Sequence, residues 1–552
     1  VARMLGDMIE DVANVGHDDL TALPGIGQGT ADRIVEFIET GRIEEHQKLL
    51  TKIPVGLLKL LAIPGLGPKT VALLWKQAGV ESEDDLRRNL TGDELASLPG
   101  MGKKKLENLR KNLAFAQRAA ARVGIGTAMP QAKWFVQQLD RLKQVKQAAY
   151  AGSLRRGRET IGDIDLLVAA EAKHSISISN AFVKLEPVAE VQAKGTTKTS
   201  IRTTDGLQVD LRIVGPDQFG AALMYFTGSK QHNVVLRERA IRQGMKLNEY
   251  GLFQNDKSVA GKTEQQVYDA LGLSWVPPEL REDRGEIVLA ENDFRHKAGA
   301  GIAGLPKLIA LADIQSELHA HTTASDGKWS IRELASAAAE RGFHTVAVTD
   351  HSKGQAQANG LNEQRLEKHI EDIHAVAAQM KGTITVLAGS EVDILANGKL
   401  DYPNSLLKQL DIVVASPHSA LSQDTAKATA RLLKAIQNPY VTMVAHPTGR
   451  LINRREGLSP DMKRVIAAAA ERGIALEINA NSWRLDLRDS HARAAIEAGV
   501  KLSINTDAHG PGDLDQLIYG VLTARRAGAT KKDVINCMSR VALTKWMDST
   551  RS

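Results

Sequence analysis

The chain has 552 residues, too many for one hydrophobic core, and its length predicts about three or four domains. Its 43% apolar and 25% charged content is that of an ordinary globular protein, and a net charge of +6 attracts polyanions only mildly. No stretch approaches the roughly 18 consecutive apolar residues of a membrane span, and the acidic start lacks the apolar segment of a signal peptide. Cys537 is the single cysteine, which excludes an intrachain disulfide and favours a reducing cytoplasm.

One short pattern occurs three times in the first 110 residues: Leu23-Pro-Gly-Ile-Gly27, Ile63-Pro-Gly-Leu-Gly67 and Leu98-Pro-Gly-Met-Gly102. Helical segments flank each copy, and the glycines allow a tight loop whose amides point to a helix N-terminus. Such a loop holds a phosphate without reading a base. One copy would be a plain turn more often than not, whereas three copies resemble the helix-hairpin-helix motif of DNA-binding proteins. The expected DNA contacts are Gly25, Gly27, Gly65, Gly67, Lys69, Gly100, Gly102 and Lys103. For the run Lys103–Lys105, a solvated helix face is an equal alternative.

A second signal extends from Gly152-Ser153 to Asp163-Ile-Asp165, which an apolar run follows. On a strand, Asp163 and Asp165 project to one face, where two carboxylates repel each other unless a cation lies between them. Asp210 sits between apolar neighbours and offers a third carboxylate, because a buried acid needs a partner or a metal. A lone Asp-x-Asp is more often a surface pair. With Gly-Ser ten residues upstream, the pattern predicts a two-metal site that activates a 3′-hydroxyl and stabilises a pyrophosphate leaving group.

These residues, with Tyr225-Phe-Thr-Gly-Ser229 and Leu247-Asn-Glu-Tyr-Gly-Leu252, resemble the family X DNA polymerases over residues 1–285. The resemblance implies that Asp163, Asp165 and Asp210 are catalytic and bind Mg²⁺ or Mn²⁺. It implies nucleotide contacts from Gly152, Ser153, Arg156, Gly162, Tyr225, Phe226, Gly228, Ser229 and Asn233. Tyr225 and Phe226 would discriminate against ribose, and the Gly228–Ser229 peptide would be cis. Further DNA contacts are implied for Arg212, Arg237 and Tyr250.

The sequence departs from that family pattern at one position. Arg33 stands where the vertebrate polymerase beta type has a lysine that forms a Schiff base with an abasic sugar. A guanidinium stays protonated and cannot act as that nucleophile, so a lyase activity of the usual type is not expected.

Ten of the 15 histidines follow residue 312, and most of them end apolar, strand-like runs. Helical stretches at 331–341 and 462–472 separate these runs, which predicts a β/α barrel with its site at the C-terminal strand ends. A single histidine at a strand end is usually structural, but six with three carboxylates favour Zn²⁺, Mn²⁺ or Fe²⁺. Clustered metals would bind phosphate oxygens and generate hydroxide from water. The candidate ligands are His319, His321, Asp326, His351, Glu391, His418, His446, Asp507 and His509.

This half resembles the PHP (polymerase and histidinol phosphatase) family over residues 311–545, and the resemblance implies three metals. His319, His321, Glu391 and Asp507 would hold one, with Glu391 bridging to a second that His418 and His446 complete. Asp326, His351 and His509 would hold the third. Arg450 and Arg484 follow ligand strands and have two equal interpretations, as phosphate ligands or as salt bridges at the barrel rim.

The expected architecture is multidomain: an all-α helix-hairpin-helix N-terminal region, an α+β nucleotidyltransferase palm and an α/β PHP domain with a distorted (β/α)7 barrel. The expected boundaries are 1–50 (lyase-like helix-hairpin-helix domain), 51–125 (further helix-hairpin-helix subdomain), 126–230 (palm), 231–285 (nucleotide-selection subdomain), 286–312 (linker, with a flexible joint at 298–304) and 313–552 (PHP domain). Because the sequence begins at Val1 and not at Met, an N-terminus that starts upstream is also considered.

The two resemblances together imply a monomeric, cytoplasmic, nucleoid-associated repair enzyme that acts on gapped or primed DNA and dNTPs, without a membrane. It would fill short gaps in base excision repair or end joining, and the PHP domain would add 3′→5′ exonuclease activity and 3′-end cleaning or AP endonuclease activity. Two alternatives remain from other classes. One is a 3′ nuclease or phosphatase that uses the polymerase half as a DNA-binding platform. The other is a DNA-binding scaffold for repair partners.

Overall fold

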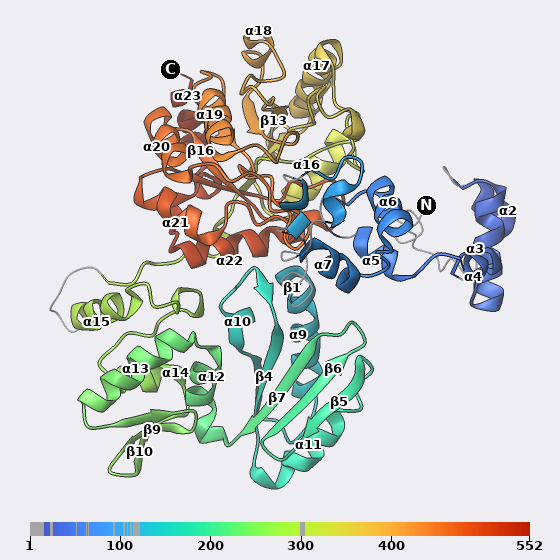
Figure 1. Cartoon of the computed structure of the whole chain (residues 1–552). Helices are drawn as coiled ribbons and strands as arrows, with labels where there is room; N and C mark the ends of the chain where they lie inside the picture. The colour runs from blue at the N-terminus through green and yellow to red at the C-terminus, as the bar shows by residue number, and fades with distance from the viewer. Residues whose placement is uncertain are drawn as a thin grey trace. The chain divides into compact units, whose positions relative to one another are not determined.

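The computed structural model describes residues 16–22, 26–50, 52–61, 63, 66–91, 94–102, 105–107, 109–110, 113, 122–297 and 304–551. The chain divides into two compact units, residues 1–118 and 119–552, each of which is described by itself (Figure 1). In the described part of the chain, no helix is both long and apolar enough to cross a lipid bilayer.

The first unit is all-α, as expected. Its described helices are α2 (His17–Ala22), α3 (Gln28–Thr40), α4 (Glu44–Leu50), α5 (Gly56–Leu61), α6 (Pro68–Ala78), α7 (Glu83–Thr91) and the 3-10 helix η2 (Glu94–Ser97). The last glycine of each repeated motif begins a helix in the same way. The carbonyls of Gly27, Gly67 and Gly102 each accept hydrogen bonds from the amides three and four residues further on, at 2.8–3.2 Å. Gly25, Gly65 and Lys103 lie outside the described residues.

The palm is a five-stranded sheet in the order β2-β4-β7-β6-β5. Its strands are β2 (Gln147–Tyr150), β4 (Asp163–Ala169), β5 (Val188–Lys194), β6 (Lys198–Thr203) and β7 (Gln208–Val214), and its helices are α9 (Ile125–Asp140), α10 (Gly152–Arg155) and α11 (Ser175–Phe182). A separate pair joins β1 (Val123–Gly124) to β3 (Thr160–Ile161). Strands β4 and β7 are parallel, with Asp165 opposite Asp210, so the sheet brings two of the expected acids together.

A smaller α+β region follows the palm. It contains α12 (Phe219–Thr227), α13 (Lys230–Arg242), β8 (Lys246–Asn248), β9 (Gly251–Gln254), β10 (Lys257–Ala260), α14 (Glu264–Ala270) and α15 (Glu286–Lys297). Helix α15 occupies the first part of the range 286–312 that was expected to be a linker, before the flexible joint expected at 298–304. It forms because Ile287 and Ala290 are buried in the hydrophobic core of this region. The glycine-rich residues 298–303, which prompted the linker prediction, lie outside the described residues.

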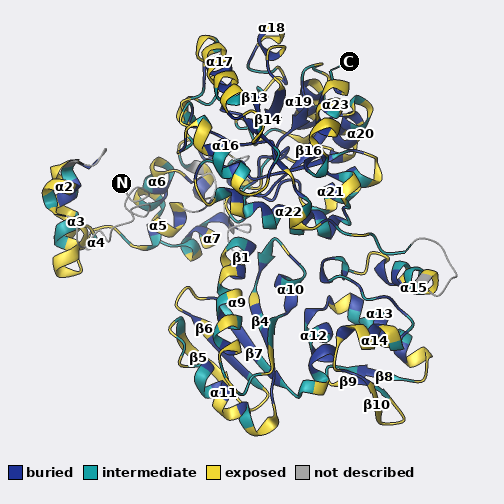
Figure 2. Cartoon of the chain, turned by 180° about the vertical axis from the view of Figure 1, so that it is seen from behind, coloured by how far each residue is buried: buried dark blue, intermediate teal, exposed yellow. Residues whose placement is uncertain are grey.

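The C-terminal domain is a ring of seven parallel strands in chain order, and this confirms the predicted barrel. The strands are β11 (Ser316–Glu317), β12 (Thr345–Val348), β13 (Thr385–Asp393), β14 (Ile412–Ser416), β15 (Met443–Val444), β16 (Ala475–Asn479) and β17 (Leu502–Asn505). A parallel bridge from Ala320 to Ala508 links the first and last strands. The strands are buried, whereas the surrounding helices carry exposed outer faces (Figure 2).

The helices of this domain follow the strands in alternation. They are α16 (Ile331–Glu340), α17 (Glu363–Gln379), α18 (Asn404–Leu407), α19 (Thr425–Ile436), α20 (Met462–Arg472), α21 (Asp489–Glu497), α22 (Leu517–Ala527) and α23 (Arg540–Ser549). Short 3-10 helices occupy Ala172–His174, Pro216–Gln218, Pro278–Leu280, Leu311–Asp313, Ala356–Ala358, Asp513–Gln516, Lys531–Asp533 and Ile535–Cys537.

A buried ion-pair network connects the palm to α14. Arg155 donates to both carboxylate oxygens of Glu264 at 2.7 and 2.8 Å. Arg281, which is fully buried, donates to the same carboxylate at 2.8 Å. Burial alone would raise the pKa of Glu264, but the two arginines outweigh it and hold that pKa below its ordinary value. Glu264 is therefore ionised in the folded protein and neutralises two otherwise uncompensated cations.

We expect Glu264→Gln to lower the stability of the polymerase region by about 3 kcal/mol, because it leaves buried arginines without their counter-charge. Because folding lowers the Glu264 pKa, its contribution is complete above the ordinary value near 4.5 and is lost as the pH falls below it. Calorimetric melting of the full chain at neutral pH measures the loss. Glu371→Gln is the control, since it breaks an exposed pair with Lys368 at 3.3 Å and should cost at most about 1 kcal/mol. Equal effects of the two substitutions would contradict the role of Glu264.

Candidate active sites

The three palm acids form one group. The carboxylates of Asp163, Asp165 and Asp210 each offer an oxygen within 4.8 Å of the others. Burial first, and then the charges of Asp163 and Asp210, raise the pKa of Asp165 to about 7. Three hard oxygen donors that repel one another at this separation fit a divalent cation of the Mg²⁺ or Mn²⁺ type, because such a cation offsets the repulsion.

Lys198 is a member of this site that sequence reasoning missed. Lys198 lies on β6, the strand next to β7, and its Nζ lies 2.8 Å from Asp210 Oδ2. Burial by itself would raise the pKa of Asp210, but the hydrogen bonds from Lys198, Ser200 and Gln208 outweigh it and lower that pKa. No local signal marks Lys198, because its role depends on the pairing of β6 with β7.

Gly152 has a steric reason for being glycine. Its φ is +64°, and a Cβ added there would lie 2.4 Å from Asp165 Oδ2. The turn that carries Gly152 also fixes β4 directly, since the Ala151 amide donates to the Asp165 carbonyl at 2.8 Å. The position of the Gly-Ser turn and the position of Asp165 therefore depend on each other.

A cationic cavity of about 710 Å³ lies beside the acids and contains several of the predicted nucleotide contacts. Its lining residues are Arg122, Ser153, Arg156, Arg158, Ser229, Lys230, Gln231, Glu282 and Asp283. Ser153, Arg156 and Ser229 were predicted, whereas Arg122, Arg158 and Lys230 were not. In this structure Arg156 Nε donates to Glu282 Oε1 at 3.0 Å, so this carboxylate competes with a phosphate group for Arg156.

The Tyr-Phe-Thr-Gly-Ser segment borders the same cavity, since Ser229 lines it. The Gly228–Ser229 peptide is cis, which confirms the implied geometry. Arg212 lies over the Phe226 ring, 4.1 Å from its centroid, and the Asn233 amide donates to the Tyr225 carbonyl at 2.7 Å.

The remaining predicted positions lie around these residues. Gly162 is close to the Arg122 guanidinium, 3.1 Å from where a Cβ would stand. Arg237 belongs to α13, and the Tyr250 ring follows β8 with 48% of its surface exposed.

In the barrel, three of the predicted ligands follow the strands by the same interval. His418, His446 and Asp507 each lie two residues beyond the end of β14, β15 and β17, respectively. Parallel strands end at one face of the barrel, so these side chains meet Glu391, which lies within β13. His446 Nε2 lies 2.7 Å from Glu391 Oε1, and His418 Nε2 lies 3.2 Å from the same atom.

The nine predicted ligands lie close together. The structure places them in groups that overlap more than the three metal sites implied by the resemblance. Three groups have ligand atoms within 4.8 Å of one another: His319, His321, Glu391 and Asp507; His351, Glu391 and His418; His321, Asp326, His351 and His509. The first group is the implied one. His321 and His351 each belong to two groups, and His446 contacts the cluster through Glu391.

Two carboxylates that sequence reasoning did not single out orient the histidines. Glu477 accepts from His319 Nδ1 at 2.8 Å, and Asp393 accepts from His418 Nδ1 at 2.6 Å. Each contact fixes the ring so that Nε2 faces the cluster, as carboxylate–histidine pairs do at metal sites. His319 Nε2 and Glu391 Oε2 are buried without a hydrogen-bond partner among the described residues, which fits a bound metal. The sequence does contain a signal for Glu477, because this acid lies within an apolar run that is typical of a buried strand.

Charges within the cluster also favour metal binding. Burial, and then repulsion from His509 and His351, lower the pKa of His321 to about 4, so its imidazole is neutral. Burial would raise the pKa of Glu391, but the surrounding histidines, His418 first, hold it well below its ordinary value. Burial would lower the pKa values of His319, His418 and His509, but the neighbouring carboxylates outweigh it and raise all three. A metal that binds these imidazoles therefore displaces their protons. Imidazoles together with carboxylates are the donor set of Zn²⁺, Mn²⁺ and Fe²⁺ sites.

The structure separates the two arginines that had equal interpretations. Arg450 pairs with Glu159 of the palm at 2.6 Å and is 4% exposed, which supports a structural salt bridge. Arg484 Nε lies 3.5 Å from Asp507 Oδ2, and its Nη1 is buried without a hydrogen-bond partner among the described residues. Arg484 is thus the arginine that faces the cluster.

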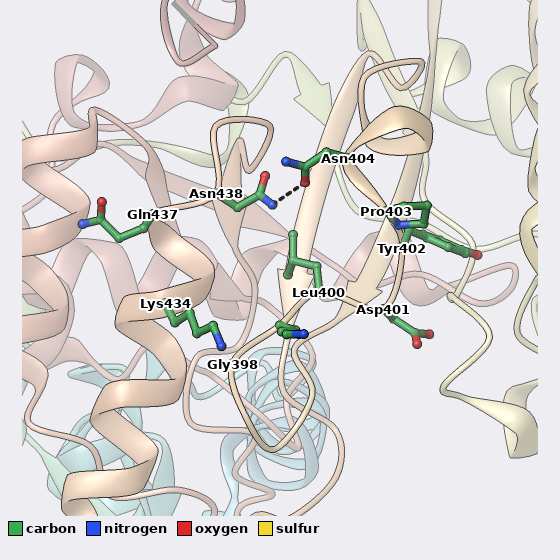
Figure 3. A pocket seen from close by; sticks show the side chains of 10 residues that line it. Gly398, Leu400, Asp401, Tyr402, Pro403, Asn404, Lys434, Gln437 and Asn438 are labelled. Carbon is green, nitrogen blue, oxygen red and sulfur yellow. Dashed lines mark hydrogen bonds between the residues drawn. The ribbon is translucent and has the colours of Figure 1, made fainter.

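Another cavity of the barrel domain, of about 440 Å³, is lined by residues of 398–404 and 434–438 (Figure 3). Asn438 donates to Asn404 at 2.8 Å across it. None of its lining residues belongs to a metal-ligand group of the described residues.

Comparison with known families agrees with these two sites. Residues 222–282 match the DNA polymerase beta thumb, residues 317–481 match the PHP domain, and residues 6–40 and 57–114 match a SAM-like helix-hairpin-helix tandem. The DNA polymerase/3′-5′ exonuclease PolX of Bacillus subtilis (strain 168) is 37% identical over 526 residues, which cover 95% of this chain and 90% of that protein.

Other relatives match the barrel half alone. A probable phosphatase of Thermoanaerobacter sp. (strain X514) is 31% identical over 231 residues, which cover 40% of this chain and 89% of that protein. A probable phosphatase of Shewanella loihica is 32% identical over 203 residues, which cover 35% of this chain and 77% of that protein. The chain belongs to the family X DNA polymerases that carry a C-terminal PHP domain.

Proposed function

We propose that this protein is a DNA-directed DNA polymerase whose PHP domain is a metal-dependent 3′→5′ exonuclease. The observation that carries the proposal is the presence of two separate metal-ligand sets on two folds. One is a carboxylate trio beside a cationic cavity, and the other is a histidine-rich cluster at the barrel strand ends. The first suits nucleotidyl transfer and the second suits phosphodiester hydrolysis.

In the polymerase site, Asp163, Asp165 and Asp210 would hold two Mg²⁺ or Mn²⁺ ions. Such ions, when bound, activate the primer 3′-hydroxyl and stabilise the departing pyrophosphate. Ser153, Arg156 and Ser229 line the cavity and would bind the triphosphate. Their hydroxyls and guanidinium supply hydrogen bonds and a positive charge to its oxygens.

Other residues of the polymerase half would position the sugar and the template. Tyr225 and Phe226 would lie under the incoming sugar and exclude a ribose. Asn233 would contact the nucleotide, and Arg212, Arg237 and Tyr250 would contact the DNA.

The helix-hairpin-helix glycines would contact the DNA backbone. A Cβ added at Gly27, Gly67 or Gly102 would meet no atom of the described residues within 4 Å. Internal packing therefore gives no reason for glycine at these positions, whereas a close approach of phosphate to the backbone amides does. Lys69 and Gly100 belong to the same proposed interface. Gapped or primed DNA is the proposed substrate.

In the PHP site the nine ligands would hold three divalent ions, of Mn²⁺, Zn²⁺ or Fe²⁺ type. Such ions, when bound, supply hydroxide and neutralise the scissile phosphate. The chain's own carboxylates, Glu477 and Asp393, orient His319 and His418 for this task. We also propose 3′-end cleaning or AP endonuclease activity at this site, and gap filling in base excision repair or end joining by a monomer at the nucleoid in the cytoplasm.

A sugar-phosphate lyase of the usual type is not proposed. Arg33 lies on α3 and pairs with Glu45 at 2.6 Å. Its guanidinium stays protonated and is not a Schiff-base nucleophile.

A second candidate function follows from the phosphatase relatives of the barrel half. In it, the chain is mainly a 3′ nuclease or phosphatase, and the polymerase half holds the DNA. The two candidates differ in whether primer extension occurs with dNTPs and Mg²⁺ or Mn²⁺ on one-nucleotide-gapped DNA.

We expect Asp163→Ala with Asp165→Ala to lower primer extension roughly 1,000-fold or more, because bound metals are worth several kcal/mol of transition-state stabilisation. The same protein should digest 3′ ends at the wild-type rate. His319→Ala with His321→Ala should have the opposite effect. A labelled primer, incubated with and without dNTPs, reports both activities.

The matched control is Asp205→Ala, an exposed acid of the palm, which should leave both activities unchanged. Absence of extension by the wild-type protein at every enzyme concentration would reject the polymerase proposal. Digestion that survives His319→Ala/His321→Ala would reject the PHP site as the exonuclease.

Gly152→Ala should lower extension about 100-fold while exonuclease activity persists. The new Cβ would overlap Asp165 Oδ2, and displacement of a catalytic group by about 1 Å costs on the order of 100-fold. Gly244→Ala is the matched control, because its φ of +71° is equally positive but an added Cβ meets no atom within 4 Å. That variant should lose about 1 kcal/mol of stability and keep its extension rate. Similar extension rates in the two variants would show that contact with Asp165 is not the reason for Gly152.

A further inference from the structure

Trp483 is an exposed aromatic residue that directly precedes Arg484, which lies 3.5 Å from the metal ligand Asp507. It lies in the loop between β16 and α21, and 43% of its surface is exposed. A large aromatic ring with much of its surface open to solvent can contact a ligand. The Arg454 guanidinium lies over the ring, 3.9 Å from its centroid, and adds a positive charge to that surface.

The loop that carries Trp483 is held in place on both sides. The Ile452 amide donates to the Trp483 carbonyl at 2.6 Å, and the Trp483 amide donates to Asn481 Oδ1 at 3.0 Å. Leu485, two residues further on, is 1% exposed. The ring is therefore presented by a fixed backbone, which lowers the conformational entropy that a ligand has to remove when it binds.

The next residue connects this ring to the cluster. Arg484 lies 3.5 Å from the Asp507 carboxylate and keeps a buried Nη1 without a hydrogen-bond partner among the described residues. A guanidinium that has one buried, unpaired N–H group beside metal ligands is suited to a phosphate oxygen. Because adjacent Cα atoms lie about 3.8 Å apart, a strand whose scissile phosphate bound Arg484 would pass close to residue 483.

We propose that Trp483 is a stacking platform for the 3′-terminal nucleobase of the DNA strand that the PHP site digests, with Arg454 supplying charge to the same strand. The proposal rests on the proposed exonuclease function. Stacking on an aromatic ring tolerates every base, since each has a π face, so the platform serves a nuclease without sequence preference. It also distinguishes a nucleic acid end from a small phosphate ester, because a small ester offers no base to stack.

The test uses the full-length protein and single-stranded DNA whose 3′-terminal residue carries either a base or an abasic sugar. Trp483→Ala should lower kcat/KM on the base-bearing end about tenfold or more. It should leave kcat/KM on the abasic end within about twofold of wild type, where no stacking exists to lose. Trp483→Phe should restore most of the loss, because the smaller ring still stacks.

Two controls separate stacking from damage to the fold. Val541→Ala removes another exposed apolar side chain of the same domain and should not change either rate. Melting of Trp483→Ala should match wild type. An equal loss on both ends, or no loss on the base-bearing end, would overturn the platform. Failure of the wild-type protein to digest either end would instead reject the underlying exonuclease proposal. In that case the wild-type protein and His319→Ala/His321→Ala would both show no digestion.

Discussion

Parallel strand pairing brings together most of the metal ligands among the described residues, and the proposed chemistry depends on it. In the palm, β4 and β7 run side by side in register, so Asp165 lies opposite Asp210. In the barrel, seven parallel strands end at one face, which brings together His321 and Asp507 from positions 186 residues apart. Local sequence sets the identity of each ligand, but only the strand register sets the distance between ligands.

The two sites compensate for the repulsion between neighbouring carboxylates in different ways. The palm has only carboxylates as ligands, so it compensates from outside, through Lys198 on Asp210, and Asp165 still has its pKa raised to about 7. The barrel interleaves acids with histidines, and these hold the pKa values of Glu391 and Asp507 well below their ordinary range. An all-oxygen set suits hard ions such as Mg²⁺, whereas the mixed set suits borderline ions. The difference in donor type is therefore also a difference in which metal each half would recruit.

Much of this arrangement is predictable from local patterns, and the rest depends on long-range contacts. The strand that carries Asp163 and Asp165 and the order of the barrel strands follow from residue spacing, which is local information. Lys198 matters only because β6 pairs with β7, and nothing near it in sequence indicates that contact. Glu282 is similar, since its partner Arg156 is 126 residues away. The helix at 286–297 escaped prediction because its stabilising contacts are with a core that the neighbouring glycine-rich segment does not reveal.

The two ligand sets have no residue in common, but the hydrophobic core of the palm includes residues from loops of the barrel. Ile452 and Leu485 come from barrel loops but pack in the hydrophobic core of the palm. Arg484 directly precedes Leu485 in sequence and lies 3.5 Å from the metal ligand Asp507. A side chain in the palm core and one at the hydrolytic centre are thus adjacent on one fixed backbone. Well-packed cores transmit displacement instead of absorbing it. The packing of Leu485 in the palm core and the position of Arg484 at the PHP cluster therefore depend on the same loop, although the two ligand sets are separate.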